Sequence, residues 1–195
     1  MEMPHERDKH AWRTEILARR AQITPQRRAR EAAALAAAVE EVELPEVVCA
    51  YVPTSDEPGS IALLDTLRRS ARVLVPVTGP PGPLDWAEFT GTDHLRRGRF
   101  GLLEPTGSAL GPAQIARAGL VLVPALAVDR YGVRLGRGAG YYDRTLAAMR
   151  PDARSVAVVR DDELVERLPC EPHDLRMGWA LTPGAGMRRL LTPRE

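Results

Sequence analysis

The run GLVLVPALAV at residues 119–128 is the most apolar stretch of the chain, and the loop DRYGVRLGRGAGYYD at residues 129–143 follows it directly. A short, continuous apolar run that ends at polar and glycine residues is typical of a strand buried on both faces. We therefore expect residues 119–128 to form the central strand of a sheet, with a helix at residues 141–149.

Strand-like and helix-like segments alternate on both sides of this strand. Short β-branched apolar runs predict further strands at residues 47–53, 72–77, 155–159 and 179–182, and an edge strand at 86–89. Amphipathic spacing and capping residues predict helices at residues 8–21, 25–41, 60–69 and 161–168. Residues 79–83 (GPPGP) are expected to be an insertion or a hairpin region, and residues 93–107 to be irregular, with a short helical piece at most. The 195 residues thus predict one α/β domain, 1–195, whose mainly parallel sheet binds ligands beyond the carboxyl ends of its strands.

Composition and charge exclude several classes of partner. The chain has 27 Lys plus Arg against 26 Asp plus Glu, and 5% of its residues are aromatic, which argues against nucleic-acid binding. No apolar run approaches the length of a membrane span, and the first residues lack the apolar core of a signal peptide. Cys49 and Cys170 are widely separated, as expected of reduced thiols. We expect a cytoplasmic monomer with no nucleic-acid or membrane partner.

The loop after the central strand carries the features of an anion site. Gly136, Gly138 and Gly140 allow positive φ angles and a close approach of backbone N–H groups to a ligand. Arg134 and Arg137 add positive charge, and the next helix offers free N–H groups. The pattern is neither a P-loop nor a dinucleotide-binding turn. An ordinary glycine-rich turn is the alternative, but the arginines, the paired tyrosines and the position after the strand favour a polyphosphate cradle.

Several charged residues elsewhere are candidates for the same site. Asp143 would be a hard ligand for Mg²⁺ or only a favourable charge in the first turn of a helix. Asp174 would be a second magnesium ligand or a surface aspartate. Lys9, the only lysine of the chain, shares a helix face with Arg13, so the pair would bind an anion or form a solvated face. Glu57 lies in the loop after the first strand, where it would either bind a ligand or be a solvated turn residue.

Four separated segments resemble the 5-formyltetrahydrofolate cyclo-ligase family, also called methenyltetrahydrofolate synthetase. They are KHAWR at residues 9–13, YVPTSDE at 51–57, FGLLEP at 100–105 and VPALAVDRYGVRLGRGAGYYD at 123–143. The resemblance covers nearly the whole chain and implies a three-layer α/β/α fold. It also implies an enzyme that uses ATP and Mg²⁺ to close 5-formyltetrahydrofolate to the 5,10-methenyl form, with release of ADP and phosphate.

The resemblance further implies the roles of individual residues. ATP would contact Lys9, Arg13, Arg134, Leu135, Gly136, Arg137, Gly138, Ala139, Gly140, Tyr141 and Tyr142. The folate would contact Val52, Glu57, Arg137, Gly138, Gly140 and Tyr141. Arg137 and Tyr142 would take part in catalysis, and Asp143 and Asp174 would bind magnesium.

Two positions depart from the family pattern. Relatives often have Lys or Gly where this chain has Ala139, and often an aspartate near Gly178. The loss of a lysine would weaken ATP binding before it abolished turnover. A non-catalytic folate- or nucleotide-binding paralogue is therefore the alternative function.

Overall fold

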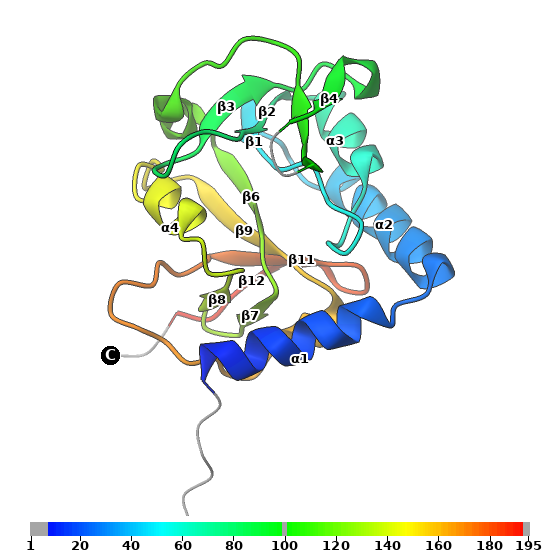
Figure 1. The fold of residues 1–195 in the computed structure, drawn as a ribbon, viewed down its shortest axis with the longest axis vertical. Helices are drawn as coiled ribbons and strands as arrows, with labels where there is room; N and C mark the ends of the chain where they lie inside the picture. The colour runs from blue at the N-terminus through cyan, green and yellow to red at the C-terminus, as the bar shows by residue number, and fades with distance from the viewer. Residues whose placement is uncertain (1–7, 99–100, 193–195) are drawn as a thin grey trace, which may run out of the picture.

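Seven strands form the central sheet of the computed structural model, which describes residues 8–98 and 101–192 (Figure 1). The strand order is β12-β11-β9-β6-β1-β2-β3. Their bounds are β1 Val47–Cys49, β2 Arg72–Val77, β3 Asp85–Glu88, β6 Leu120–Pro124, β9 Arg154–Val158, β11 Trp179–Thr182 and β12 Gly186–Arg189.

The five inner strands of this sheet are parallel, and the two edge strands are antiparallel to their neighbours. Strand β1 pairs in parallel with β2 and with β6, and β9 pairs in parallel with β6 and with β11. Strand β3 forms an antiparallel hairpin with β2, and β12 does the same with β11. The predictions of a mainly parallel sheet, of β6 as its central strand and of an edge strand near residues 86–89 are confirmed.

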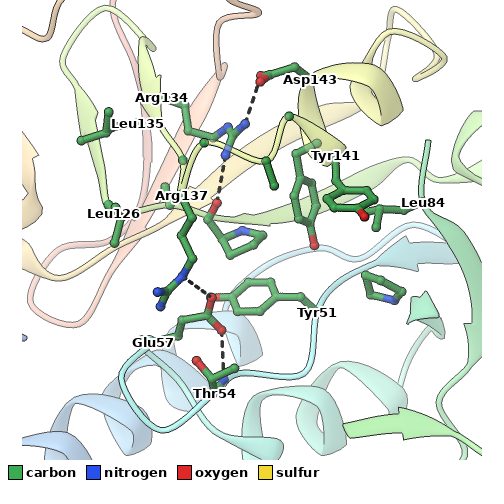
Figure 2. Close-up of a pocket in the computed structure, with 18 of the residues that line it drawn as sticks. Tyr51, Thr54, Glu57, Leu84, Leu126, Arg134, Leu135, Arg137, Tyr141 and Asp143 are labelled. Carbon is green, nitrogen blue, oxygen red and sulfur yellow. Dashed lines mark hydrogen bonds and ion pairs between the residues drawn. The ribbon is translucent and has the colours of Figure 1, made fainter. Parts of the chain in front are cut away.

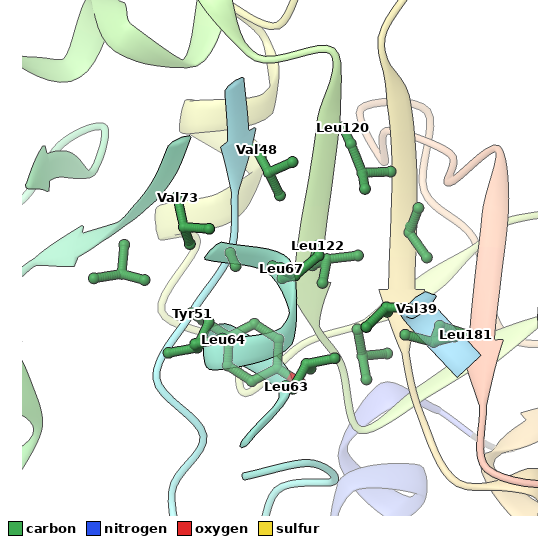
Figure 3. Packing of buried hydrophobic residues seen from close by; sticks show 14 of the residues in the cluster. Val39, Val48, Tyr51, Leu63, Leu64, Leu67, Val73, Leu120, Leu122 and Leu181 are labelled. Carbon is green, nitrogen blue, oxygen red and sulfur yellow. The ribbon is translucent and has the colours of Figure 1, made fainter. Parts of the chain in front are cut away.

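Helices cover both faces of the sheet. They are α1 Lys9–Ala21, α2 Pro25–Glu40, α3 Ile61–Arg68 and α4 Tyr141–Leu146. Successive strand residues point to opposite faces. Val48 therefore packs with residues of α2 and α3 (Figure 3), whereas Cys49 packs on the side of α4. The fold is thus α/β with three layers. No helix among residues 8–98 and 101–192 has the length and apolar character needed to cross a bilayer.

Side chains cap the N-termini of three helices, and two of these caps, Thr24 and Ser60, were expected from the sequence. The side chains of Asp8, Thr24 and Ser60 accept hydrogen bonds from backbone N–H groups in the first turns of α1, α2 and α3. Such caps satisfy donors that have no partner within the helix. Helices α1, α2 and α3 consequently match their predicted ranges closely.

The prediction of a helix at residues 161–168 is wrong. A 3₁₀ turn, η4 (Asp161–Glu163), leads into the short strand β10 (Leu164–Val165). Strand β10 pairs with β7 (Ala127–Asp129), which also pairs with β8 (Arg134–Leu135). Tertiary pairing therefore overrides the local preference of the acidic segment for a helix start.

Other boundaries differ because the chain leaves the sheet earlier than the apolar runs suggest. The predicted strand at residues 119–128 divides into β6 and β7, and that at 47–53 ends at Cys49.

The segment expected to be irregular contains η1 (Thr92–His94) and a hairpin of β4 (Leu95–Arg97) and β5 (Leu103–Pro105). Another 3₁₀ turn, η3 (Pro112–Arg117), precedes β6. Strand β12 was not predicted, and Phe100 of the FGLLEP segment lies outside the described residues.

Candidate active site

A cavity of about 890 Å³ opens at the carboxyl ends of the inner strands, and every candidate site residue predicted from the sequence lines it (Figure 2). Strands β1 and β6 are neighbours in the sheet. The strands that follow β1 in the chain add to the sheet on one side of this pair, and those that follow β6 add on the other side. Open α/β sheets bind ligands at such a point, where the strand order reverses. The cavity is therefore where the fold class places a ligand site.

The glycine-rich loop after β8 uses its glycines for two different reasons. Gly138 and Gly140 have φ angles of 103° and 72°, which favour glycine over residues with a side chain. Gly136 has no such angle, but a Cβ atom there would lie 2.8 Å from Nη1 of Arg134. The expected left-handed conformations are thus present at two of the three positions, and close packing accounts for the third.

Arg134 is fixed beneath this loop. Its side chain is 6% exposed, Nη1 donates to the Pro124 carbonyl at 3.2 Å, and Nη2 donates to Oδ1 of Asp143 at 3.0 Å. The guanidinium lies 5.8 Å from the centre of the Tyr142 ring. Its Nε is buried and finds no hydrogen-bond partner in the described residues. Arg134 thus supplies an immobile positive charge and an unused donor at the cavity wall.

Arg137 extends from the same loop toward the loop after β1 (Figure 2). Its Nη2 donates to Oδ2 of Asp56 at 2.5 Å, and its Nε lies 3.9 Å from Oε1 of Glu57. Burial opposes ionisation of Asp56, but hydrogen bonds from Arg137 and Thr54 outweigh it and lower the pKa of Asp56. Arg137 therefore joins the predicted phosphate loop to the predicted folate loop.

Helix α1 brings two cations to the cavity. Lys9 Nζ contacts Oε2 of Glu171 at 2.6 Å and Oδ2 of Asp174 at 2.9 Å. Arg13, one turn later, donates from Nε to the Gly136 carbonyl at 2.9 Å. Burial acts to lower the pKa of Lys9, but its hydrogen bonds to the two carboxylates outweigh this and raise it. Lys9 is thus already neutralised by carboxylates, whereas Arg13 has only a carbonyl partner among the described residues.

The candidate metal ligands Asp143 and Asp174 differ in their surroundings. Glu171, His173 and Asp174 have ligand atoms within 4.8 Å of one another. Asp143 belongs to no such group of three within the described part of the chain, and it faces Arg134 instead. Burial acts to raise the pKa of Asp174, but the Glu171 backbone N–H and Lys9 outweigh it and lower this pKa. Asp174 thus stays ionised, with the Lys9 ammonium as its present cationic partner.

Two tyrosines of the cavity wall, Tyr51 and Tyr142, remain protonated at neutral pH. Burial, followed by the charge of Glu57, raises the pKa of Tyr142. Burial likewise raises the pKa of Tyr51, whose hydroxyl donates to the Pro58 carbonyl at 3.3 Å. The Tyr141 ring lies 5.5 Å from the Arg144 guanidinium. The Tyr142 phenol can therefore donate a hydrogen bond to a ligand without ionising.

Some residues of the cavity were not predicted. Glu104 is 7% exposed and accepts a hydrogen bond from the Thr78 N–H at 2.7 Å. It belongs to the FGLLEP segment, which resembles the family, although no residue of that segment was predicted to line the site. Asp56 adjoins the predicted Glu57. Arg20 is fully buried at the cavity wall, and nothing in the sequence separates it from the other arginines.

The two departures from the family pattern lie in different surroundings. Ala139 lines the cavity, and its carbonyl accepts a hydrogen bond from Nη2 of Arg144 at 3.1 Å. Gly178 instead donates its N–H to Oγ of Ser155 at 3.0 Å and is not among the residues that line the cavity. Only the substitution at Ala139 is placed to affect a ligand directly.

Comparisons with known proteins agree on one family. The model of the 5-formyltetrahydrofolate cyclo-ligase family matches residues 5–183. The 5-formyltetrahydrofolate cyclo-ligase of Mycolicibacterium smegmatis is 48% identical over 189 residues, which cover 93% of this chain and 96% of that protein. The Escherichia coli K12 enzyme of the same name is 29% identical, with 86% and 96% covered.

Solved structures show the same fold. The 5,10-methenyltetrahydrofolate synthetase of Aquifex aeolicus superposes with a TM-score of 0.78 at 25% identity, covering 96% of this chain and 95% of that one. The corresponding protein of Mycoplasma pneumoniae gives a TM-score of 0.70 at 17% identity, with 89% and 98% covered. At that identity the second match supports the fold alone.

Proposed function

Because the chain belongs to the 5-formyltetrahydrofolate cyclo-ligase family, we propose that its cavity is the place where ATP and the reduced folate react. The protein is an enzyme that cyclises 5-formyltetrahydrofolate to 5,10-methenyltetrahydrofolate. The use of ATP, with release of ADP and phosphate, belongs to the proposal. So do a cytoplasmic location and a monomeric state.

The observation that carries the proposal is the convergence of Lys9, Arg13, Arg134 and Arg137 on one cavity that also holds Glu57. These four cations suit a triphosphate, since charge-assisted hydrogen bonds to phosphate contribute about 1.5 to 3 kcal/mol each. Lys9, Arg134 and Arg137 pair with carboxylates here, so a triphosphate would compete with those carboxylates for them. Glu57, across the cavity, suits the amino edge of a pterin. The two loops thus offer one subsite for each substrate.

In the proposed reaction the formyl oxygen attacks the γ-phosphorus of ATP, and ADP leaves. The resulting N5 iminium phosphate is then attacked by N10, which loses its proton to solvent, the ring closes, and phosphate departs with the former formyl oxygen. The protein's task is to position the reactants and to neutralise charge. Arg137 would hold the transferred phosphoryl group, and Tyr142 would donate a hydrogen bond to the reacting formyl group.

Residues that suit magnesium are present in the cavity. Mg²⁺ prefers oxygen ligands and usually takes one or two carboxylates together with phosphate oxygens and water. Asp174 is ionised and close to a second carboxylate, and Asp143 lies beside the glycine-rich loop. We assign Asp143 and Asp174 as the residues that would hold the ion. Bound magnesium would neutralise part of the phosphate charge, and Lys9 and the arginines would neutralise another part.

The test is a turnover assay with purified protein. MgATP and 5-formyltetrahydrofolate should produce the methenyl chromophore, with ADP and phosphate formed in equal amounts. Omitting ATP, or adding excess EDTA, should abolish the signal. Product without ATP would refute the nucleotide assignment, and absence of product with all components would refute the proposed reaction. A crystal soaked with a non-hydrolysable ATP analogue should show Arg134 and Arg137 contacting its phosphates.

A further inference from the structure

A chain of buried ion pairs lies behind the loop of residues 54–57, outside the groups used in the proposed reaction. Arg20, Arg160 and Glu163 are each no more than 2% exposed. Removing charged groups from water is costly, and their mutual attraction offsets that cost only when geometry and hydrogen bonding are very good. Apolar residues of similar size would often be as stable, so these charges call for a specific role.

Glu163 is the centre of this network. Its Oε1 accepts from Nε of Arg20 at 2.7 Å, and its Oε2 accepts from Nη2 of Arg20 at 2.9 Å. The same Oε2 accepts from the backbone N–H of Arg160 at 2.9 Å, and Nη1 of Arg160 lies 3.6 Å from Oε1. A two-point contact of this kind fixes orientation as well as distance. Helix α1 is thereby held against the segment that follows β9.

Arg160 connects this network to the loop after β1. Its Nε donates to Oε2 of Glu31 in α2 at 2.8 Å, and its Nη1 donates to the backbone carbonyl of Asp56 at 3.1 Å. Arg28, also in α2, donates from Nη1 to the carbonyl of Ser55. Two successive carbonyls of the loop are therefore held by guanidinium groups, one from Arg28 in α2 and one from Arg160, which is itself bonded to Glu31 of α2.

The loop has no regular secondary structure, so its shape depends on such contacts. The Glu57 carboxylate accepts from the Thr54 N–H at 2.9 Å, and the Glu57 N–H donates to the Thr54 carbonyl at 3.1 Å. Asp56 lies between these two residues and also receives Arg137. Holding the Asp56 carbonyl from behind therefore sets where the carboxylates of Asp56 and Glu57 point into the cavity.

We infer that Arg160 is a positioning residue for folate binding, which acts by fixing the Asp56 carbonyl and hence the Glu57 carboxylate. Arg160 itself is not among the residues that line the cavity. The inference rests on the proposed function, because it takes Glu57 as the folate-binding carboxylate. It predicts an effect on one substrate only, whereas a purely structural role would lower the amount of folded protein and leave both KM values unchanged.

The experiment compares Arg160→Gln and Arg160→Lys with the wild-type enzyme, well below the melting temperature of each variant. Lysine keeps the charge but lacks the planar fork that reaches Glu31 and Asp56 from different nitrogens. We expect KM for 5-formyltetrahydrofolate to rise about tenfold or more in Arg160→Gln, and by a smaller factor in Arg160→Lys. KM for ATP should change less than about twofold. Arg69→Gln, which breaks an exposed pair with Glu40, is the control with the same charge change.

If Arg160→Gln does not fold, Arg160→Lys decides the matter alone. Hydrogen exchange at the Thr54 and Glu57 amides should also accelerate in the Arg160 variants and not in Arg69→Gln. A folate KM within about twofold of wild type, or equal rises in both KM values, would overturn the inference. Failure of the wild-type protein to turn over the folate would instead count against the proposed function.

Discussion

Arg134 in β8 and Arg137 in the glycine-rich loop differ in how freely their side chains can move. The Arg134 side chain is 6% exposed and held on two sides, whereas the Arg137 side chain is 48% exposed and paired with Asp56. Exposed ion pairs contribute only about 0.2 to 1 kcal/mol, so a triphosphate can draw Arg137 away from Asp56 at little cost. Arg134 would form the rigid part of the subsite and Arg137 the part that adapts to the ligand.

Replacing Arg137 with alanine should lower kcat/KM by roughly 10² to 10³, because two charge-assisted hydrogen bonds of about 1.5 kcal/mol or more each would be lost. Initial rates of methenyl product formation at varied ATP give the value. Arg150→Ala, which removes an exposed arginine paired with Asp152, should leave kcat/KM unchanged. A near-normal rate for Arg137→Ala would remove this residue from the site.

The metal assignment makes a separate prediction for Asp143. Asparagine keeps the size of the side chain and an oxygen acceptor for Arg134 but removes the charge. In Asp143→Asn, the magnesium concentration for half-maximal rate should rise about tenfold or more, because a charged oxygen ligand is lost. A magnesium titration at saturating ATP measures this. Asp174→Asn should act in the same direction, and if only Asp174→Asn shifts the titration, the ion is held at the Glu171–Asp174 side alone.

At the scale of elements, the sequence was informative where one segment carries its own structural signal. Capping residues and apolar spacing located α1, α2 and α3, and the apolar run located β6. Glycines and arginines within a few residues of one another predicted a phosphate loop, and this loop lines the cavity. These signals are local, so they are visible without knowledge of the fold.

The elements that were missed depend on partners far away in the sequence. Glu163 pairs with Arg20, and Leu164 pairs with Val128, so the segment at 161–168 becomes a 3₁₀ turn and a strand despite its acidic start. Strand β12 exists because Gly186, with a φ angle of 63°, allows the chain to turn back along β11. Asp56 and Arg20 also have their partners, Arg137 and Glu163, far away in the sequence, so the sequence alone could not assign them to the site.

Cys49 in strand β1 allows a test of the packing on the α4 side of the sheet. Cys49 is 0% exposed, and burial raises its pKa to about 12, whereas Cys170 is exposed. Because the thiolate is the reactive form, we expect one thiol to react with an aromatic disulfide reagent in the native protein and two in denaturant. Cys170→Ala should reduce the native count to zero. Rapid labelling of both thiols without denaturant would contradict the packing of β1.

Over the whole molecule, the loop before β11 is tied to helix α1 by the pair of Lys9 and Asp174, which predicts how stability depends on pH. The pKa of Asp174 is lowered in the folded state, so its contribution is present above the unfolded pKa of about 3.9 and is lost as pH falls through the folded value. The pKa of Lys9 is raised, so its contribution is present below about 10.4 and is lost as pH rises through the folded value.

The contribution of this pair to the free energy of unfolding should therefore show a plateau between these limits, measured by urea denaturation of wild type and Lys9→Met at a series of pH values. Lys9→Met should lower the plateau by roughly 1 kcal/mol or less, since the pair is only partly buried, and should weaken the fall at both ends. Arg69→Met, at an exposed pair, should leave the curve unaltered. An identical profile for wild type and Lys9→Met would show that the pair contributes nothing to stability.

Because Lys9 is the only lysine of the chain and its ammonium contacts two carboxylates at the cavity, the protein carries a single ε-amino group as a built-in chemical reporter. Amine-acylating reagents modify only the unprotonated form, so the raised pKa makes Lys9 slow to label. The labelling rate at this one position, followed by peptide mass spectrometry, would then record how a nucleotide or a divalent cation alters its surroundings.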